Sequence, residues 1–170
     1  MKQLLHSALL FLLFNTVGQA QDMFLKEGRA TYQTNAKGHW MAGGGLTFIG
    51  VTGKAGRFVA DHVWLGGELE HLSFFGTRYE AGVFARYYKG KGMLNGILGT
   101  GVTYGQFKGW TFDGPMPPAY RSVKLNALLG LELRLTERVS FEGVAKIGWL
   151  TAAQCVQFSP QGSLNVYLGR

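Results

Sequence analysis

Apolar and polar residues alternate along most of the chain beyond residue 38. Between residues 78 and 88, one face of an extended strand holds Tyr79, Ala81, Val83, Ala85 and Tyr87, and the residues between them form the other face. No stretch beyond residue 20 sustains an apolar helical period. Repeated alternation with a period of two, bounded by Gly, Asp, Lys and Pro, is typical of β-strands. The pattern therefore predicts an all-β fold.

Eight segments of the chain show this alternation. They cover residues 39–50, 54–60, 63–74, 78–88, 93–107, 122–135, 139–150 and 162–169. The connections at 60–62, 89–92 and 136–138 are tight, and those at 108–120 and 151–161 are long. An even number of strands, with short turns at one rim and longer loops at the other, is typical of an antiparallel up-and-down transmembrane β-barrel.

The charged residues of the most regular strands fall on one face of each strand. That face carries Arg78, Glu80 and Arg86 in the fourth segment, Lys124, Glu132 and Arg134 in the sixth, and Glu142 and Lys146 in the seventh. Two architectures produce such a pattern. A secreted soluble lipocalin-like barrel turns its apolar face inward, whereas a membrane barrel turns its apolar face toward lipid.

Aromatic residues on the apolar face favour the membrane barrel. Three pairs stand eight positions apart: Trp40 and Phe48, Tyr79 and Tyr87, and Phe141 and Trp149. Eight residues of strand cover roughly 26 Å at about 3.3 Å per residue. A strand tilt of about 40° reduces this to about 20 Å along the membrane normal, close to the roughly 25 Å between the aromatic girdles of such barrels.

Glycine on the charged face favours the same architecture. The glycines assigned to that face are Gly43, Gly45, Gly82, Gly99, Gly101, Gly130 and Gly148. A narrow barrel interior needs missing side chains where long ones cross it, and a solvated face does not. The predicted interior charges are Glu68, Glu70, Glu80, Glu132 and Glu142 against Arg78, Arg86, Lys124, Arg134 and Lys146. Five oppose five, so we expect paired charges to plug the lumen and to leave no large pore.

The N-terminus has the features of a secretory signal peptide. Lys2 precedes a mostly apolar run at residues 4–14, and the small residues Gly18 and Ala20 mark a cleavage site. The apolar run is shorter than the roughly 20 residues of a membrane helix. We therefore predict a signal peptide at 1–20, a periplasmic lead-in at 21–38 and a barrel domain at 39–170. Gln21 stands where a lipoprotein would have cysteine, so no lipid anchor is expected.

Composition narrows the function classes. The single cysteine, Cys155, cannot form an internal disulfide framework, and the four scattered histidines do not suggest a metal site. We expect no metal and no cofactor. The net charge of +7 becomes +6 without Lys2. A basic surface suits lipid phosphate as well as nucleic acid, and an exported protein seldom meets nucleic acid, so no nucleic-acid partner is expected.

Three stretches of the chain resemble a known family. They are residues 57–69 (RFVADHVWLGGEL), 83–88 (VFARYY) and 129–143, which contains LTERVSFEG. They resemble the small bacterial outer-membrane β-barrel domain family, over nearly the whole mature chain. The resemblance implies a Gram-negative outer-membrane protein without assigned activity, in contact with outer-membrane lipid, lipopolysaccharide and the barrel-assembly machinery, and monomeric. It also implies an aromatic final residue, from which the ending Tyr167-Leu168-Gly169-Arg170 departs.

Candidate catalytic chemistry is sparse. His71 and Ser73 lie on the outward parity near the outer end of the third strand, a placement that resembles lipid A deacylase barrels. Those enzymes would have Asn after the serine, and here it is Phe74. A nucleophile and base also need an orienting carboxylate, which no spacing supplies. A polar pair at the headgroup boundary is the simpler interpretation.

Two further features suggest chemistry only weakly. Residues 99–105 (GTGVTYG) resemble a dinucleotide fingerprint, but the third glycine comes one place late and no helix follows. Cys155 is expected in the last long loop, as an exposed residue without a catalytic role. We therefore predict a non-enzymatic outer-membrane barrel with a structural or surface-binding role. The alternatives are a lipid-modifying outer-membrane enzyme and a secreted soluble ligand-binding barrel.

Overall fold

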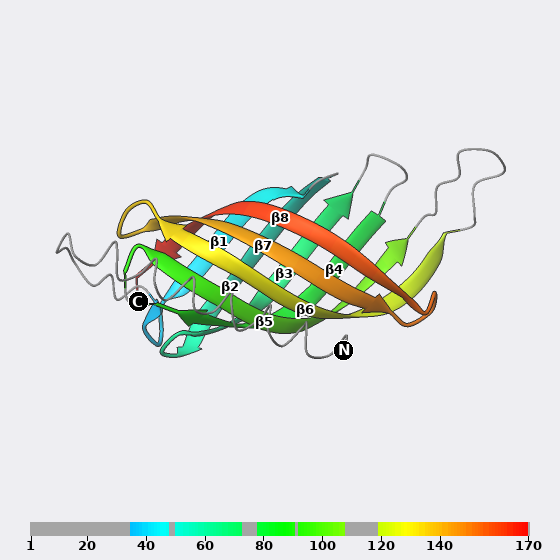
Figure 1. Ribbon diagram of the computed structural model, residues 1–170, viewed down its shortest axis with the longest axis horizontal. Helices are drawn as coiled ribbons and strands as arrows, with labels where there is room; N and C mark the ends of the chain where they lie inside the picture. Colours follow the sequence, from blue (N-terminus) through cyan, green and yellow to red (C-terminus); the bar gives the residue numbers. More distant parts are fainter. Residues whose placement is uncertain (1–34, 48–49, 73–77, 91, 108–118, 170) are drawn as a thin grey trace, which may run out of the picture.

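The strands close into one antiparallel barrel in sequence order, and β8 pairs with β1 (Figure 1). The computed structural model describes residues 35–47, 50–72, 78–90, 92–107 and 119–169. The strands are β1 (Trp40–Thr47), β2 (Gly50–Ala60), β3 (Val63–Leu72), β4 (Arg78–Lys89), β5 (Leu94–Phe107), β6 (Tyr120–Arg134), β7 (Val139–Leu150) and β8 (Cys155–Leu168). The described residues contain no helix of the length and apolarity needed to cross a bilayer.

The two ends of the barrel differ. The turns β2–β3, β4–β5 and β6–β7 and the end of β8 lie together at the left of Figure 1, and the β7–β8 turn lies at the opposite end. Because short turns face the periplasm in this architecture, we call the first the periplasmic end and the second the extracellular end. The signal peptide prediction and residues 21–34 of the predicted lead-in fall outside the described residues.

Several predicted strand boundaries are wrong. Gly50, predicted to end the first strand, lies in β2, and β6 begins at Tyr120 rather than at residue 122. β2 begins at Gly50 rather than at residue 54, and β8 begins at Cys155 rather than at residue 162. The long loop expected at 151–161 is therefore a tight turn at 151–154.

The start of β8 was missed because its lumen-facing positions are polar. Ser159, for example, is buried in the lumen, although in the sequence it resembles a loop residue. Pro160 also disfavoured the prediction of a strand from the sequence. In the structure, however, the pairing of β8 with β1 ends at Gln161, so Pro160 has no partner residue in β1. A residue without an N–H is tolerated on such a free edge.

The apolar face of every strand points outward. Large apolar side chains exposed on the barrel wall include Leu46, Leu69, Val83, Val102, Leu125, Ile147 and Leu164. The charged face points into the lumen, where Glu142 and Arg86 are buried. This orientation contradicts the lipocalin-like alternative, which requires the apolar face inside. A wall of this kind needs a lipid solvent, since no soluble monomer exposes so large an apolar band.

Aromatic side chains mark both edges of the apolar band. Trp40, Tyr87 and Phe141 are exposed toward the periplasmic end, and Tyr79, Tyr104, Trp149 and Phe158 toward the extracellular end. The predicted pairs Tyr79 and Tyr87, and Phe141 and Trp149, are therefore confirmed as outward pairs. Phe48 lies outside the described residues. Two aromatic girdles around an apolar band are the signature of a membrane-spanning barrel.

Candidate functional site

The lumen is the most densely charged part of the molecule. It buries the five predicted glutamates together with six cationic side chains, because Lys54 joins the predicted five. The expected balance of five against five is therefore wrong by one cation. Lys54 was not assigned to the lumen from the sequence, because the predicted second strand begins at residue 54 and so puts Lys54 at the end of the barrel. In the structure, Lys54 sits opposite Glu68 in the register of β2 and β3.

A continuous chain of ion pairs crosses the middle of the lumen. Lys54 Nζ lies 2.6 Å from Glu142 Oε1, and the Arg86 guanidinium bridges Glu142 and Glu68. Lys146 then joins Glu68 to Glu70, whose carboxylate also accepts a hydrogen bond from Gln161. These side chains come from β2, β3, β4, β7 and β8, so the chain of pairs ties opposite walls of the barrel together. Such pairing offsets the free-energy cost of removing the charges from water.

Two smaller clusters lie on either side of this central chain. Toward the extracellular end, Glu80 pairs with Arg78 and with Lys124, and it accepts a hydrogen bond from Thr103. Toward the periplasmic end, Glu132 accepts hydrogen bonds from Tyr167 and Asn95 and lies 3.4 Å from Arg134 Nε. Each of the eleven buried charges thus has an oppositely charged partner.

Residues 35–38 close the periplasmic end of the lumen. Asn35 is buried and accepts a hydrogen bond from Arg134 through its side chain and one from the His62 N–H through its carbonyl. The Gly38 carbonyl accepts a hydrogen bond from Arg57 Nε. The final residues of the predicted lead-in therefore pack against the barrel rim.

Aromatic rings fill the lumen between the charge clusters. Phe58 contacts Tyr88 and Tyr167, with ring centroids 5.6 and 6.1 Å apart. The Trp64 ring lies over Gly56 and Gly66, so that a Cβ atom on either glycine would collide with it. The Phe84 ring occupies the same position over Gly101. The prediction that lumen glycines make room for large neighbours is confirmed at Gly101, and Gly56 and Gly66 play the same part although they were not among the glycines predicted to do so.

The other sequence candidates do not form a site in the described residues. Residues 99–105 lie within strand β5, so they are not a phosphate-binding loop. Cys155 is exposed, as expected, but it begins β8 instead of lying in a loop. No group of three metal-ligating side chains occurs among the described residues.

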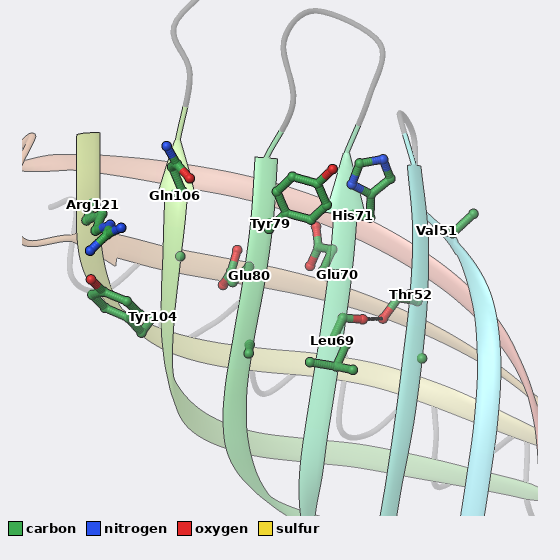
Figure 2. Close-up of a pocket in the computed structure, with 13 residues that line it drawn as sticks. Val51, Thr52, Leu69, Glu70, His71, Tyr79, Glu80, Tyr104, Gln106 and Arg121 are labelled. Atoms are coloured by element: carbon green, nitrogen blue, oxygen red, sulfur yellow. Dashed lines mark hydrogen bonds between the residues drawn. The ribbon is translucent and has the colours of Figure 1, made fainter. Parts of the chain in front are cut away.

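His71 lies in a groove on the outer wall at the extracellular end (Figure 2). Its ring contacts that of Tyr79 in a tilted arrangement, with centroids 4.6 Å apart, and its Nδ1 is shielded and has no hydrogen-bond partner among the described residues. Ser73 and Phe74 lie outside the described residues, so the predicted His71 and Ser73 pair is not tested. The groove has a volume of about 750 Å³.

Strand register arranges the groove in two rows. The upper row runs across β2 to β6 as Val51, His71, Tyr79, Gln106 and Arg121. The lower row lies two residues nearer the membrane centre and contains Gly53, Leu69, Ala81, Tyr104 and Val123. The upper row is rich in hydrogen-bonding groups, and the lower row is apolar apart from the Tyr104 hydroxyl. Sequence reasoning found His71 and Tyr79 separately but missed the row, which only the strand register reveals.

Comparisons with known proteins match the fold alone. No protein-family model matches the chain, and no curated protein matches it. The β-barrel domain of Pseudomonas aeruginosa OprF superposes with a TM-score of 0.64 at 15% identity, over 76% of this chain and 96% of that one. Neisserial surface protein A superposes with a TM-score of 0.51 at 12% identity, over 75% of this chain and 92% of that one. The Yersinia pestis outer membrane protein Ail, in a phospholipid bilayer nanodisc, superposes with a TM-score of 0.51 at 11% identity, over 78% of this chain and 100% of that one.

The chain has the fold of the small bacterial outer-membrane barrels. The eight-stranded closed sheet and these structural neighbours confirm the predicted fold class and the resemblance stated from the sequence. With the apolar band and aromatic girdles of its wall, they also confirm the outer membrane as the location of this barrel.

Proposed function

We propose that this outer-membrane barrel is a non-enzymatic structural protein whose lumen is closed and whose outer end contacts lipopolysaccharide. The observation that carries the closed lumen is the set of eleven buried charges, each of which has an oppositely charged partner, with the central pairs running from wall to wall. An eight-stranded barrel encloses only enough room for side chains, and here paired charges and aromatic rings occupy that room. A monomer is expected, since closure of the barrel pairs every strand with both of its neighbours and leaves unpaired edges only at strand ends.

The surroundings of His71 support a non-enzymatic role. A catalytic histidine needs a carboxylate or similar group that orients its ring through a hydrogen bond. Instead, the His71 ring contacts the tilted ring of Tyr79, and its shielded Nδ1 has no hydrogen-bond partner in the described part of the chain. If the protein were a lipid A deacylase, it would remove acyl chains from lipid A, and the His71→Ala variant would not. We expect identical lipid A acyl composition with the protein and with this variant, measured by mass spectrometry of the cells' lipid A.

Solute permeability tests the closed lumen. Proteoliposomes that contain the purified full-length mature protein are diluted into an isotonic sugar solution, and their swelling is followed by light scattering. A porin serves as the positive control, because barrels of about sixteen strands leave an aqueous channel. We expect swelling no faster than that of protein-free vesicles. Swelling at a rate comparable to the porin would overturn the proposal of a closed lumen.

A further inference from the structure

The groove on the outer wall carries unused hydrogen-bonding capacity. Neither Arg121 nor Gln106 forms a side-chain hydrogen bond or ion pair with another described residue, although both are exposed. Tyr79 has 58% of its side chain exposed and contacts His71 only through its ring. Figure 2 shows Arg121, Gln106 and Tyr79 along the open rim of neighbouring strands, with Tyr104 below Arg121.

The electrostatics of the groove select an anion. Arg121 contributes a positive charge on the outer wall. The nearby carboxylates of Glu70 and Glu80 point into the lumen, where Lys146 and Lys124 pair with them. No acidic side chain among the described residues faces outward along either row. A guanidinium with neighbouring hydroxyl, amide and imidazole groups is well suited to a phosphate, since charge-assisted hydrogen bonds to phosphate are strong.

The lower row provides an apolar hollow beneath these polar groups. A Cβ atom added to Gly53 would meet no other atom within 4 Å, so the wall is open there. The exposed Leu69 flanks the opening, and Ala81 adds little bulk beside it. Polar groups along one edge of the groove, with an apolar hollow at its β2 end, match an amphipathic ligand and not a free ion.

The aromatic girdle places the upper row at the level of lipid headgroups. Tyr79 belongs to the upper row and Tyr104 to the lower row, and both are part of the extracellular girdle. Tyrosine in such girdles lies at the membrane interface. The hydroxyl groups of Tyr79 and Tyr104 therefore lie near the headgroups of the outer leaflet, and the apolar side chains of the lower row meet the upper part of the acyl chains.

We propose that this groove binds lipopolysaccharide, with a headgroup phosphate on Arg121 and one acyl chain in the hollow at Gly53. Tyr79 and Gln106 donate hydrogen bonds to the phosphate or to neighbouring sugar oxygens. This inference rests on the proposed contact with lipopolysaccharide and assigns the residues that make it. Both rows belong to strands and not to loops, so the site is built into the rigid wall.

Lipid retention measures binding to this site directly. The mature protein is incubated with diphosphorylated lipid A in detergent, and the lipid A molecules retained per barrel are counted by native mass spectrometry. We expect Arg121→Gln to lower the apparent affinity about fivefold to tenfold, as the loss of an exposed charged hydrogen bond does. Arg138→Gln, in an exposed turn at the periplasmic end, is the matched control and should leave affinity unchanged. Equal effects of the two variants would overturn the site.

The chemistry of the ligand is tested with the same assay. Lipid A whose phosphates have been removed should bind the wild type about as weakly as intact lipid A binds Arg121→Gln. If phosphate removal changes nothing, Arg121 does not contact a headgroup phosphate and the proposal fails. Displacement of lipid A by inorganic phosphate alone would likewise contradict it, because a free phosphate cannot compete with a ligand held also by its acyl chain.

The hollow is tested by filling it. Gly53→Leu places a side chain in open space, so the barrel should fold normally while lipid A retention falls. Gly143→Leu, on β7 and also without neighbours around its Cβ position, is the control on another part of the wall and should retain lipid A. Retention by Gly53→Leu equal to that of the wild type would overturn the hollow. Solute permeability of the wild type reports on the closed lumen separately, so failure of one proposal is distinguishable from failure of the other.

Discussion

Adjacent residues of β6 face different environments. Leu128 is 2% exposed and packs in the lumen, whereas Leu129 is only half-buried and faces the membrane. The same difference runs through every strand, since one face meets paired charges and rings while the other meets lipid. The barrel therefore has a packed interior with many polar groups, surrounded by a wall of exposed apolar side chains.

The two faces are constrained in different ways. In the lumen, each large or charged side chain has a specific partner, such as Arg86 with Glu142 or Trp64 over Gly66. On the wall, Gly53 and Gly143 have open space around them. Lipid rearranges around a changed side chain, whereas a packed interior does not. Substitutions should therefore have large effects inside the barrel and small effects outside it.

The largest effect is expected from Glu142→Gln. The Glu142 carboxylate pairs with Lys54 and Arg86 and accepts hydrogen bonds from Tyr88 and Asn165. Its loss leaves the buried Lys54 without its ionic partner and leaves Arg86 with Glu68 alone, which costs about 3 to 5 kcal/mol. The free energy of unfolding is measured by urea titration of protein in liposomes.

The matched control for this variant is Glu137→Gln. Glu137 lies exposed in the turn between β6 and β7, so its free energy of unfolding should change by less than about 0.5 kcal/mol. Similar destabilisation by both substitutions would mean that the lumen charges are hydrated and not buried in pairs.

An intermediate effect is expected from overfilling. Leu128→Trp adds bulk next to Gly99, where a Cβ atom would already lie 3.0 Å from Leu128 Cδ1, and should cost about 1 to 3 kcal/mol. Leu129→Trp enlarges a side chain in lipid and should change stability little. The same urea titration measures both. If Leu129→Trp proves the more damaging, the assignment of the inner and outer faces is reversed.

The smallest effects are expected at glycines. Gly101→Ala places a methyl group against the Phe84 ring and should destabilise the barrel by about 1 kcal/mol. Gly53→Ala meets open space and should be neutral or stabilising by about 0.5 kcal/mol, because alanine loses less backbone entropy on folding. Unfolding midpoints in urea should move in opposite directions, and a shared direction would refute the contrast between the faces.

Much of the fold was predictable from local pattern. Alternation in β4 and β7 gave both faces correctly, because regular strands record their two environments residue by residue. It failed for β8, where lumen-facing polar residues and Pro160 resembled a loop. Such residues look alike in sequence whether they meet water or a polar lumen.

The site was less predictable, because its contacts depend on barrel closure. Lys54 and Glu142 are separated by 88 positions, and no local pattern indicates which partner a lumen charge will meet. The upper row joins His71, Tyr79 and Arg121 through the register of four strands. Spacing placed His71 and Tyr79 on the outward face, but Arg121 lay outside the predicted strands, and the neighbours of all three across the sheet were undetermined.

Tryptophan quenching tests the division between the two faces most directly. Two single-tryptophan variants, with the other tryptophans replaced by Phe, retain Trp149 on the wall or Trp64 in the lumen, which are 44% and 0% exposed. Each is reconstituted into vesicles and exposed to lipids brominated in the upper acyl chain, or to aqueous iodide. The structure predicts strong quenching of Trp149 by brominated lipid and no quenching of Trp64 by either agent. Quenching of Trp64 by iodide, or a Trp149 insensitive to brominated lipid, would contradict a closed lumen inside a lipid-facing wall.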